Sequence, residues 1–415
     1  MIVIEKQFPL TILESLGVDQ LAIKSIKNHG FLAFLDFESE IILDSKKTDN
    51  GIKSLSSPCE SMDLSFSGWV GFFGYEFLGT HLGINLSAKR DINVPDGWFG
   101  RPNTIIHFLN DQTKIESCQP DRANKIAQLL EGSEIQNFDN VNFPTRSRKC
   151  NLEFSEYEKI FDQARESILD GESYQIKISQ RYEAEVKVNP LIAFHKLCQA
   201  NPAPEAFLLK NKSFSIVSCS PEIVIEKTDK HILTRPIGGT YERKKQENTK
   251  SVIERFLNDP KEVAEHNMLV DLERNDLSCI CKPGTVRLTR FREVETYAHL
   301  HHLVSTIEGE LKEKISLSDI LSAMLPGGSI TGCPKIRTMQ LIDQLEPCFR
   351  GPYTGSFGLI SDNGDLSLNL IIRSMLILEK SCYTQSGGGI VVDSTAHYEY
   401  NENNLKARAL LDLLS

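Results

Sequence analysis

The residues best suited to chemistry are concentrated in the last third of the chain, between positions 325 and 406. Glycine lets a backbone approach a ligand closely and leaves N–H groups free to point at it. Two glycine-rich turns, Arg373 on a strand between them and a carboxylate-bearing helix make an anion site beside a cation site. We therefore predict a pocket for a small, multiply charged acid. The four dense stretches are Pro326–Lys335, Arg350–Ser356, Ser386–Ser394 and Glu399–Lys406.

Two pairs of glutamates have the spacing of neighbours on one helix face. Glu262 and Glu265 lie three residues apart, and Glu399 and Glu402 repeat this spacing. Two helices that each present a carboxylate pair could hold one hard divalent cation such as Mg²⁺, with the substrate completing the shell. Alternatively, both glutamate pairs lie on helix faces exposed to solvent. This is the commoner situation for a single pair of glutamates at this spacing.

Three histidines and one more glycine-containing stretch supply further candidate site residues. Positions 295–305 read as a strand on which His299 and His301 share one face and His302 takes the other. A histidine near a leaving hydroxyl could act as a general acid, but a structural histidine has the same pattern. Positions 234–240 read as a strand that runs into a glycine turn, which an ordinary hairpin end would also explain.

Composition narrows the class of partner. The chain has 415 residues, is 40% hydrophobic and 25% charged, and carries a formal net charge of -10. This charge argues against nucleic acid or an anionic membrane as partner, and an anionic substrate would need locally concentrated positive charge. No apolar run is long enough for a membrane span, and the ten scattered cysteines fit reduced thiols in the cytoplasm.

The elements that must position these residues indicate an α+β fold of large sheets with helices outside. Helices are predicted over 121–131 and 155–170, with Gly171 ending the second. We predict two units: a β-rich N-terminal region, 1–145, intertwined with the core, and a catalytic domain, 150–415. Strands are predicted over 31–37, 40–44, 104–108 and 113–118, and a polar loop over 46–63.

Several common motifs are missing from the sequence. It has no Walker A loop, no dinucleotide fingerprint after a strand and no His-Glu-x-x-His. It also has no Gly-x-Cys-x-Gly nucleophile turn. We therefore expect no glutaminase activity in this chain.

Taken together, the motifs resemble the chorismate-utilising enzymes of the anthranilate synthase and aminodeoxychorismate synthase component I family. The resemblance runs from about Phe154 to the C-terminus. It implies large antiparallel β-sheets packed together and wrapped by helices, with the site between them, and dependence on Mg²⁺. The matching motifs, in family order, are 236–240, 264–276, 301–305, 326–335 and 387–394.

The resemblance also assigns roles to individual residues. His302 matches the general acid that helps the ring hydroxyl leave, and Glu222 matches a carboxylate near the reacting ring carbons. Four glutamates match the Mg²⁺ ligands, and a further set matches the residues that hold the carboxylates of chorismate. The metal set is Glu262, Glu265, Glu399 and Glu402; the substrate set is Thr240, Ser329, Tyr353, Arg373, Gly387, Gly388, Gly389 and Lys406.

Two positions bear on which reaction the chain catalyses. Hydroxylating relatives have a water-activating lysine where this chain has Gln175, and an amide cannot act as a base. Ammonia is therefore the expected nucleophile. Many para-aminating members carry a lysine, thought to attack the ring covalently, where this chain has Gly238. Anthranilate-forming members usually have alanine there.

Positions 301–306, 353–356 and 387–389 are more similar to the para-aminating branch. The sequence therefore predicts aminodeoxychorismate synthase component I, which acts in folate biosynthesis. Anthranilate synthase component I, of tryptophan biosynthesis, is the alternative, and a non-catalytic chorismate-binding subunit is a further one. Because the chain lacks a glutaminase motif, a separate glutamine amidotransferase is the expected source of ammonia.

Overall fold

In the computed structural model the strands pair antiparallel throughout the residues that the structure describes. The described residues are 1–26, 30–57, 62–133, 138, 141–242, 249–296 and 300–414, with only the backbone described at 240–242, 249–250, 261, 300 and 409.

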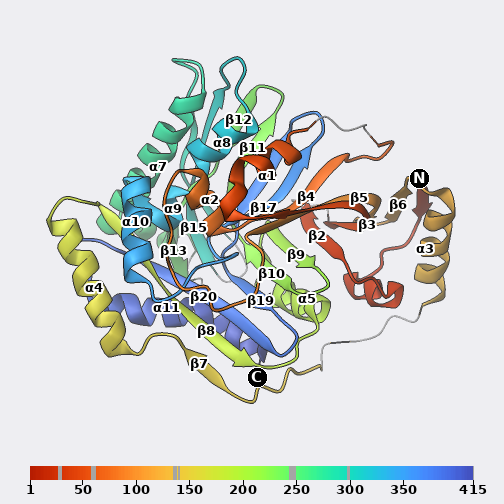
Figure 1. Cartoon of the computed structure of the whole chain (residues 1–415), viewed down its shortest axis with the longest axis horizontal. Coiled ribbons are helices and arrows are strands. Elements are labelled where there is room, and N and C mark those ends of the chain that lie inside the picture. The colour runs from red at the N-terminus through yellow and green to blue at the C-terminus, as the bar shows by residue number, and fades with distance from the viewer. Residues whose placement is uncertain are drawn as a thin grey trace.

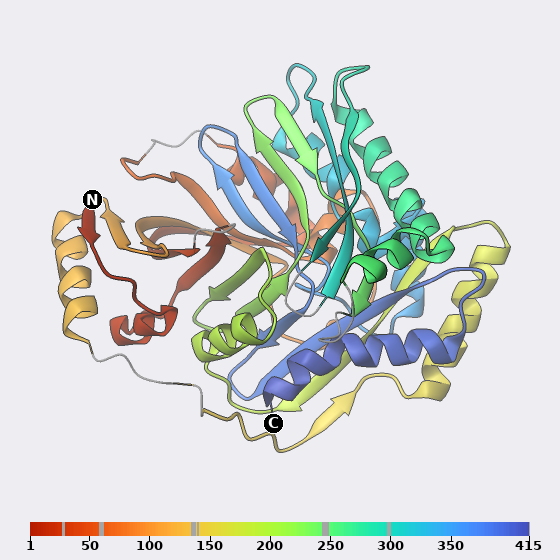
Figure 2. The same cartoon turned by 180° about the vertical axis from the view of Figure 1, so that it is seen from behind.

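Pairing spreads from the long strand β5 (Gly97–Phe108) into two arms. One arm continues through β3, β2, β9, β10, β19, β20 and β8, and the other through β4, β17, β18, β11, β12 and β15. Figures 1 and 2 show the two arms as layers that diverge from the N-terminal strands. The strands are β1 (Ile2–Ile4), β2 (Leu21–Ile26), β3 (Gly30–Leu43), β4 (Gly68–Phe73), β6 (Thr113–Ser117), β7 (Arg148–Cys150), β8 (Gln175–Glu185), β9 (Glu205–Lys210), β10 (Ser215–Ser220), β11 (Ile223–Thr228), β12 (His231–Thr234), β13 (Ile237–Glu242), β14 (Arg287–Thr296), β15 (Leu300–Glu310), β16 (Gly332–Cys333), β17 (Ser356–Ser361), β18 (Leu366–Leu370), β19 (Ser374–Ile377) and β20 (Ser381–Ile390).

The two arms pack face to face over an aromatic core. Phe207 on β9 stacks on Phe357 on β17, with ring centroids 3.9 Å apart and both side chains fully buried. Residues of β2, β3, β4, β10 and β19 complete this cluster. Buried aromatic pairs of this kind contribute about 1 kcal/mol each beyond their burial.

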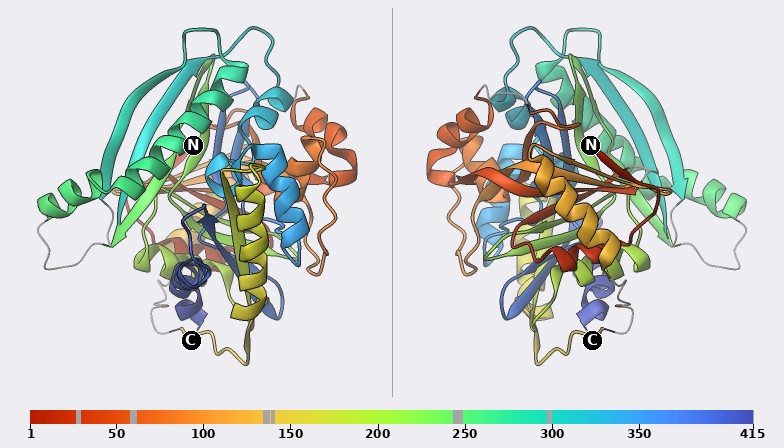
Figure 3. Two further views of the ribbon diagram at one scale, coloured as in Figure 1. Left: turned by 90° about the vertical axis from the view of Figure 1, so that its left-hand side faces the viewer. Right: turned by 90° about the vertical axis from the view of Figure 1, so that its right-hand side faces the viewer.

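Helices cover the outer faces of both arms. Helices α3 and α5 pack on the first arm, and α1, α2, α7 and α8 pack on the second. Figure 3 shows α4 and α10 beside one another, over the end of the sheet that contains β8. No helix in the described part of the chain is long and apolar enough to cross a membrane. The helices are α1 (Thr48–Leu55), α2 (Tyr75–His81), α3 (Pro120–Gly132), α4 (Phe154–Leu169), α5 (Pro190–Ala200), α6 (Thr249–Leu257), α7 (Pro260–Ile280), α8 (Leu317–Met324), α9 (Gly328–Thr331), α10 (Lys335–Leu345), α11 (Ala396–Leu411), and the short 3₁₀ turns Leu10–Leu16, Ser45–Lys47 and Asp412–Leu414.

The α+β class and the packed antiparallel sheets predicted from the sequence are confirmed, as are helices α3 and α4. Gly171 ends α4 with a positive φ of 78°, which glycine adopts without strain. Strands β5 and β6 cover the strands predicted over 104–108 and 113–118 and pair with each other.

Several local predictions were wrong. Arg373, expected on a strand, lies between β18 and β19 with a positive φ of 49°, and the glycines expected in a turn after Thr234 lie within β13. The two strands expected over 31–44 are one strand, β3, which continues through a register shift between Phe37 and Ser39. The polar stretch expected to be a loop contains α1, because Ile52 and Leu55 supply one buried face. The strand expected over 295–305 is instead the end of β14 and the start of β15, two strands that pair with each other; His299 between them lies outside the described residues.

The N-terminal strands contribute to both arms. Strand β2 pairs with β9, and β4 pairs with β17, so residues of the first hundred share one hydrogen-bonded network with the C-terminal half. The predicted domain limits, 1–145 and 150–415, stay a prediction.

Candidate active site

One wall of the site is the pair of strands β8 and β20. Gly387, Gly388 and Gly389 on β20 lie opposite Ser179, Ile178 and Lys177 on β8. Ile178 is buried against α4 and α10, so alternation turns the neighbouring Lys177 to the inner face.

Glycine is required at position 389 by two side chains of β8. A Cβ atom on Gly389 would lie 2.3 Å from Nε2 of Gln175 and 3.2 Å from Cε of Lys177. Gln175 is 1% exposed, and its Oε1 accepts no hydrogen bond from the described residues. An unpaired buried acceptor normally has a partner in the working molecule, so this oxygen marks a place for an N–H donor.

Gly388 faces the other way, towards α11. A Cβ atom on it would lie 2.5 Å from Oε2 of Glu399, so the glycine makes room for this carboxylate. Glu399 is 3% exposed and accepts a 2.8 Å hydrogen bond from Ser394. Further along α11, Glu402 pairs with Lys406 at 2.7 Å, and Lys406 also donates to the carbonyl of Gly387.

The opposite wall comes from β13 and α7. Gly239 has a φ of 68°, and a Cβ there would lie 2.5 Å from Oε2 of Glu262. A Cβ on Gly238 would lie 2.6 Å from Nδ1 of His266. The next helical turn places Oε1 of Glu265 3.8 Å from Nζ of Lys177, across the site from α7 to β8.

The four predicted metal ligands have suitable chemistry, but they are not gathered into one cluster. Carboxylate oxygens are the donors that Mg²⁺ prefers, and Gly239 and Gly388 leave space for two of them. Within the described residues, no three His, Cys, Asp or Glu side chains lie close enough together to hold a metal ion. Their partners within the chain include Lys177 for Glu265, Ser394 for Glu399 and Lys406 for Glu402.

His302 is buried between the backbone of β13 and Arg373. Its Nδ1 lies 3.3 Å from the carbonyl oxygen of Gly239, which can only accept a hydrogen bond. Its Nε2 lies 3.3 Å from a guanidinium nitrogen of Arg373, which can only donate. Burial, reinforced by the charge of Arg373, lowers the pKa of His302 to about 4. The imidazole is therefore neutral at pH 7, with its proton on Nδ1.

Glu222 is a buried carboxyl group of the site whose environment suits a proton donor. It is 6% exposed and accepts a 2.8 Å hydrogen bond from Ser329, another predicted site residue. Burial raises the pKa of Glu222 to about 7, although Ser329, Lys177 and Arg373 oppose this. The group is thus part protonated at neutral pH.

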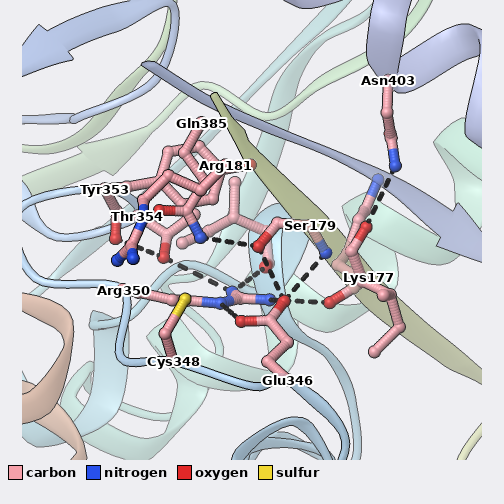
Figure 4. Close-up of polar contacts among 12 residues, drawn as sticks. Lys177, Ser179, Arg181, Glu346, Cys348, Arg350, Tyr353, Thr354, Gln385 and Asn403 are labelled. Atoms are coloured by element: carbon pink, nitrogen blue, oxygen red, sulfur yellow. Dashed lines mark hydrogen bonds and ion pairs between the residues drawn. The ribbon is translucent and has the colours of Figure 1, made fainter. Parts of the chain in front are cut away.

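Behind β8, a buried ion pair fixes the elements that surround the site (Figure 4). Arg350 donates to both carboxylate oxygens of Glu346, at 2.9 and 2.8 Å, and to the carbonyl of Lys177 at 2.7 Å. Glu346 in turn accepts from the backbone N–H and the hydroxyl of Ser179. The Arg350 guanidinium also lies over the ring of Tyr353, 5.9 Å from its centroid.

The structure therefore brings most of the predicted residues to one place, between β8 and β20 on one side and β13, β15 and α7 on the other. Tyr353 belongs to it, because its hydroxyl would lie 3.2 Å from a Cβ on Gly387. Lys406 lies on an exposed part of α11. Thr240 pairs with His302 across β13 and β15, but its side chain lies outside the described residues.

Lys177, His266 and the Arg350–Glu346 pair were not assigned a role from the sequence. His266 lies within the matching motif 264–276, and Arg350 began one of the four dense stretches. Two-residue alternation from Gln175 along β8 would have placed Lys177 on the same face of the strand.

Comparison with known proteins agrees with this fold and site. The family model described as chorismate binding enzyme matches residues 19–412. Aminodeoxychorismate synthase component 1 of Bacillus subtilis is 33% identical over 356 residues, which cover 83% of this chain and 76% of the relative. Anthranilate synthase component 1 of Lactococcus lactis is 32% identical over 410 residues, which cover 94% of this chain and 90% of the relative.

Solved structures show the same architecture. The crystal structure of anthranilate synthase component I from Streptococcus pneumoniae superposes with a TM-score of 0.81 at 28% identity, covering 91% of each chain. The menaquinone-specific isochorismate synthase from Escherichia coli superposes with a TM-score of 0.79 over 100% of this chain and 94% of its own, and its 18% identity supports the fold alone. The chain belongs to the family of chorismate binding enzymes.

Proposed function

We propose that this protein is aminodeoxychorismate synthase component I and aminates chorismate with ammonia, para to the ring carboxylate. Anthranilate synthase component I, which places the amine ortho, is the second candidate. Relatives with either name match most of the chain, so the choice depends on the residues around the ring.

Gln175 carries the choice of ammonia over water. An amide cannot take a proton from water, so the hydroxylation that a lysine at this position supports is disfavoured. The unpaired, buried Oε1 of Gln175 is an acceptor that ammonia satisfies with one of its N–H bonds.

Two observations favour different positions of the amine on the ring. The stretches 301–306 and 353–356 are similar to the para-aminating branch. Gly238 favours anthranilate, because para-aminating relatives often carry a lysine there. His266 packs against Gly238 so closely that a longer side chain has no room, and para amination in this chain would proceed without a lysine from that turn.

The remaining groups have distinct tasks in this proposal. Protonated Glu222 delivers its proton to the leaving ring hydroxyl, because its pKa of about 7 leaves a proton available at neutral pH. Neutral His302 orients Arg373 through Nε2, instead of supplying the proton. Arg373, Tyr353, Ser329, Thr240 and the glycines of β20 bind the substrate carboxylates.

Glu262, Glu265, Glu399 and Glu402 are the proposed Mg²⁺ ligands because of their donor chemistry, although in the described residues they are not gathered into one cluster. A bound Mg²⁺ would neutralise the ring carboxylate of the substrate. The ammonia would come from a separate glutamine amidotransferase, since the sequence contains no glutaminase nucleophile turn. Glutamine-dependent turnover by this chain alone would contradict that part of the proposal. Binding of chorismate without turnover on ammonia would favour a non-catalytic subunit.

Product identity tests the assignment. The purified chain is incubated with chorismate, Mg²⁺ and an ammonium salt at mildly alkaline pH, with and without aminodeoxychorismate lyase. The proposal predicts an aminodeoxychorismate mass that the lyase converts to p-aminobenzoate. Anthranilate formed without the lyase would assign the chain to the second candidate.

A further inference from the structure

Glu76 is a buried carboxyl group of the N-terminal region to which the mechanism above gives no task. It lies in the first turn of α2 and is 6% exposed. Its Oε1 accepts the backbone N–H of Arg350 and its Oε2 accepts that of Gly351, both at 2.8 Å. One carboxylate from the first hundred residues thus holds the start of a segment in the C-terminal half of the chain, residues 350–355, called here the 350–355 turn.

The 350–355 turn also lies directly on the backbone next to Glu76. The N–H of Tyr75 donates a 2.8 Å hydrogen bond to the carbonyl of Gly351. A Cβ atom on Gly355 would lie 2.1 Å from the carbonyl oxygen of Phe73, so only glycine allows this approach. The turn therefore rests on the end of β4 and the start of α2.

The 350–355 turn sets the positions of two predicted substrate-binding residues. It carries Tyr353, whose hydroxyl lies beside β20. It also pairs with the segment before Arg373: the N–H of Thr354 donates to the carbonyl of Ile371 at 2.9 Å. The N–H of Ile371 donates in return to the carbonyl of Gly355 at 3.0 Å. A shift of the turn would therefore move both Tyr353 and Arg373.

The side chain of Arg350 connects the turn to further parts of the site. Its guanidinium donates to the carbonyl of Lys177 at 2.7 Å and to that of Ile330, the residue after Ser329, at 3.2 Å. Figure 4 shows the same guanidinium between Lys177 and Tyr353. The hydrogen bond from Glu76 to the backbone of Arg350 therefore supports a side chain that contacts several elements of the site.

Stability does not explain why this position carries a carboxyl group. Burial raises the pKa of Glu76 from its ordinary 4.5 to about 7, although the N–H groups of Arg350 and Gly351 and the charge of Arg90 oppose this. Because the pKa is higher in the folded state, the ionised carboxylate lowers the free energy of unfolding as the pH rises from about 4.5 to about 7, and the loss is complete above that. A neutral side chain of the same shape would therefore be the more stable choice at pH 8.

We propose that Glu76 is a positioning residue, which holds the 350–355 turn so that Tyr353 and Arg373 meet the carboxylates of the anionic substrate. This inference rests on the proposed amination of chorismate and adds a residue of the N-terminal region to it. Glu76 acts through its two backbone partners and does not itself touch the substrate.

Steady-state kinetics of the whole chain with chorismate, Mg²⁺ and an ammonium salt are the first arm of the test. Glu76→Gln keeps the size of the side chain but turns an NH₂ group towards one of the two backbone N–H groups. We expect the KM for chorismate to rise about tenfold and kcat to change less than about twofold, because a charge-assisted hydrogen bond that supports substrate binding is lost. The matched control is Glu156→Gln, an exposed glutamate in the first turn of α4 that also accepts a backbone N–H, at 2.9 Å; it should change neither value.

A double-mutant cycle with Tyr353→Phe is the second arm. If Glu76 acts through Tyr353, Glu76→Gln should raise the KM by about threefold or less in the Tyr353→Phe background, instead of about tenfold. Urea unfolding at pH 8 should show that Glu76→Gln is no less stable than the wild type. Glu76→Asp, which keeps the charge but is one methylene shorter, is the second variant if the glutamine variant fails to fold, and its KM should lie above that of the wild type.

These outcomes can be told apart from those of the proposed function. If the wild type turns over chorismate but Glu76→Gln leaves the KM unchanged, the positioning role is overturned. The same follows if the KM rises by an equal factor in both backgrounds, or if kcat and the free energy of unfolding fall together. A wild type that binds chorismate without turnover would overturn the amination alone, and the calorimetric Kd for chorismate would then replace the KM in the same comparison of variants.

Discussion

A guanidinium nitrogen of Arg373 lies 3.3 Å from Nε2 of His302, so the arginine donates a hydrogen bond to the very nitrogen that a general acid would use. The other ring nitrogen faces the carbonyl of Gly239. This arrangement leaves His302 neutral at pH 7, and the proposal above therefore gives the proton-donor role to Glu222.

Replacing Arg373 should change how His302 titrates. Burial is the main cause of its low pKa and the charge of Arg373 the second, so Arg373→Met should raise the pKa from about 4 without restoring it to the ordinary 6.5. Titration of the imidazole ring protons by NMR measures this shift, with His302→Asn used to assign the signal. An unchanged pKa in the variant would show that the two side chains do not interact.

Glu222 should dominate the pH dependence of the reaction near neutrality. Because its pKa is raised to about 7, the protonated form needed for proton delivery is lost as the pH rises above 7. Wild-type kcat should fall over that range, while Glu222→Gln should be slower by about 100-fold or more and lack this limb. A variant that keeps the same alkaline limb would assign it to another group.

The same carboxyl predicts a stability effect with a definite sign. The folded state binds the Glu222 proton more tightly than the unfolded state does. Glu222 therefore does not lower the free energy of unfolding below about pH 4.5, and it lowers this free energy most above about pH 7. Glu222→Gln should therefore raise the free energy of unfolding at pH 8 by up to about 3 kcal/mol and leave it nearly unchanged at pH 4.5. Urea unfolding at the two pH values measures the difference. Equal effects at both would rule out the buried ionised carboxyl as the cause.

The buried Arg350–Glu346 pair should be essential for stability. Arg350→Met leaves the Glu346 carboxylate buried without its cation, and it should lower the free energy of unfolding by about 3–5 kcal/mol. Arg274→Met is the control, because its pair with Asp271 is exposed and worth at most about 1 kcal/mol. Urea unfolding measures the free energy of unfolding of both variants. Similar losses in the two would contradict the role of Arg350 in holding β8.

Gly238 should be intolerant of a side chain because of His266. A Cβ at 238 would lie 2.6 Å from Nδ1 of the histidine, so Gly238→Ala should cost about 1–3 kcal/mol through overpacking. His266→Ala added to Gly238→Ala should recover part of that loss, beyond what the two single variants predict by addition. Full additivity would mean that the two positions do not compete for space.

The sequence was informative where local patterns determine structure and where motifs are dense. Amphipathic spacing located α4, and the motifs located Glu222, His302 and Arg373 before any of their contacts were known. The contacts that set their behaviour join residues far apart in the chain: Ser329 with Glu222, and Arg373 with His302. Such pairings depend on which strands become neighbours, and no local pattern in the sequence encodes that.

The buried support of the site was hidden for the same reason. Arg350 and Glu346 have the spacing of an ordinary solvated helix pair, and only tertiary packing, by β8 and the rings of Tyr75 and Tyr353, buries the charges. Similarly, the four predicted metal ligands were read as one set. Whether they converge depends on how α7 and α11 approach β20, and in the described residues they do not form a metal cluster.

The most direct test of the central claim is the source of the new atom in the product. The chain is supplied with chorismate, Mg²⁺ and heavy-nitrogen ammonium in heavy-oxygen water, and the product is analysed by mass spectrometry. Amination predicts one heavy nitrogen from ammonium and no heavy oxygen from the solvent. A product that carries solvent oxygen and no ammonium nitrogen would show hydroxylation and contradict the role given to Gln175.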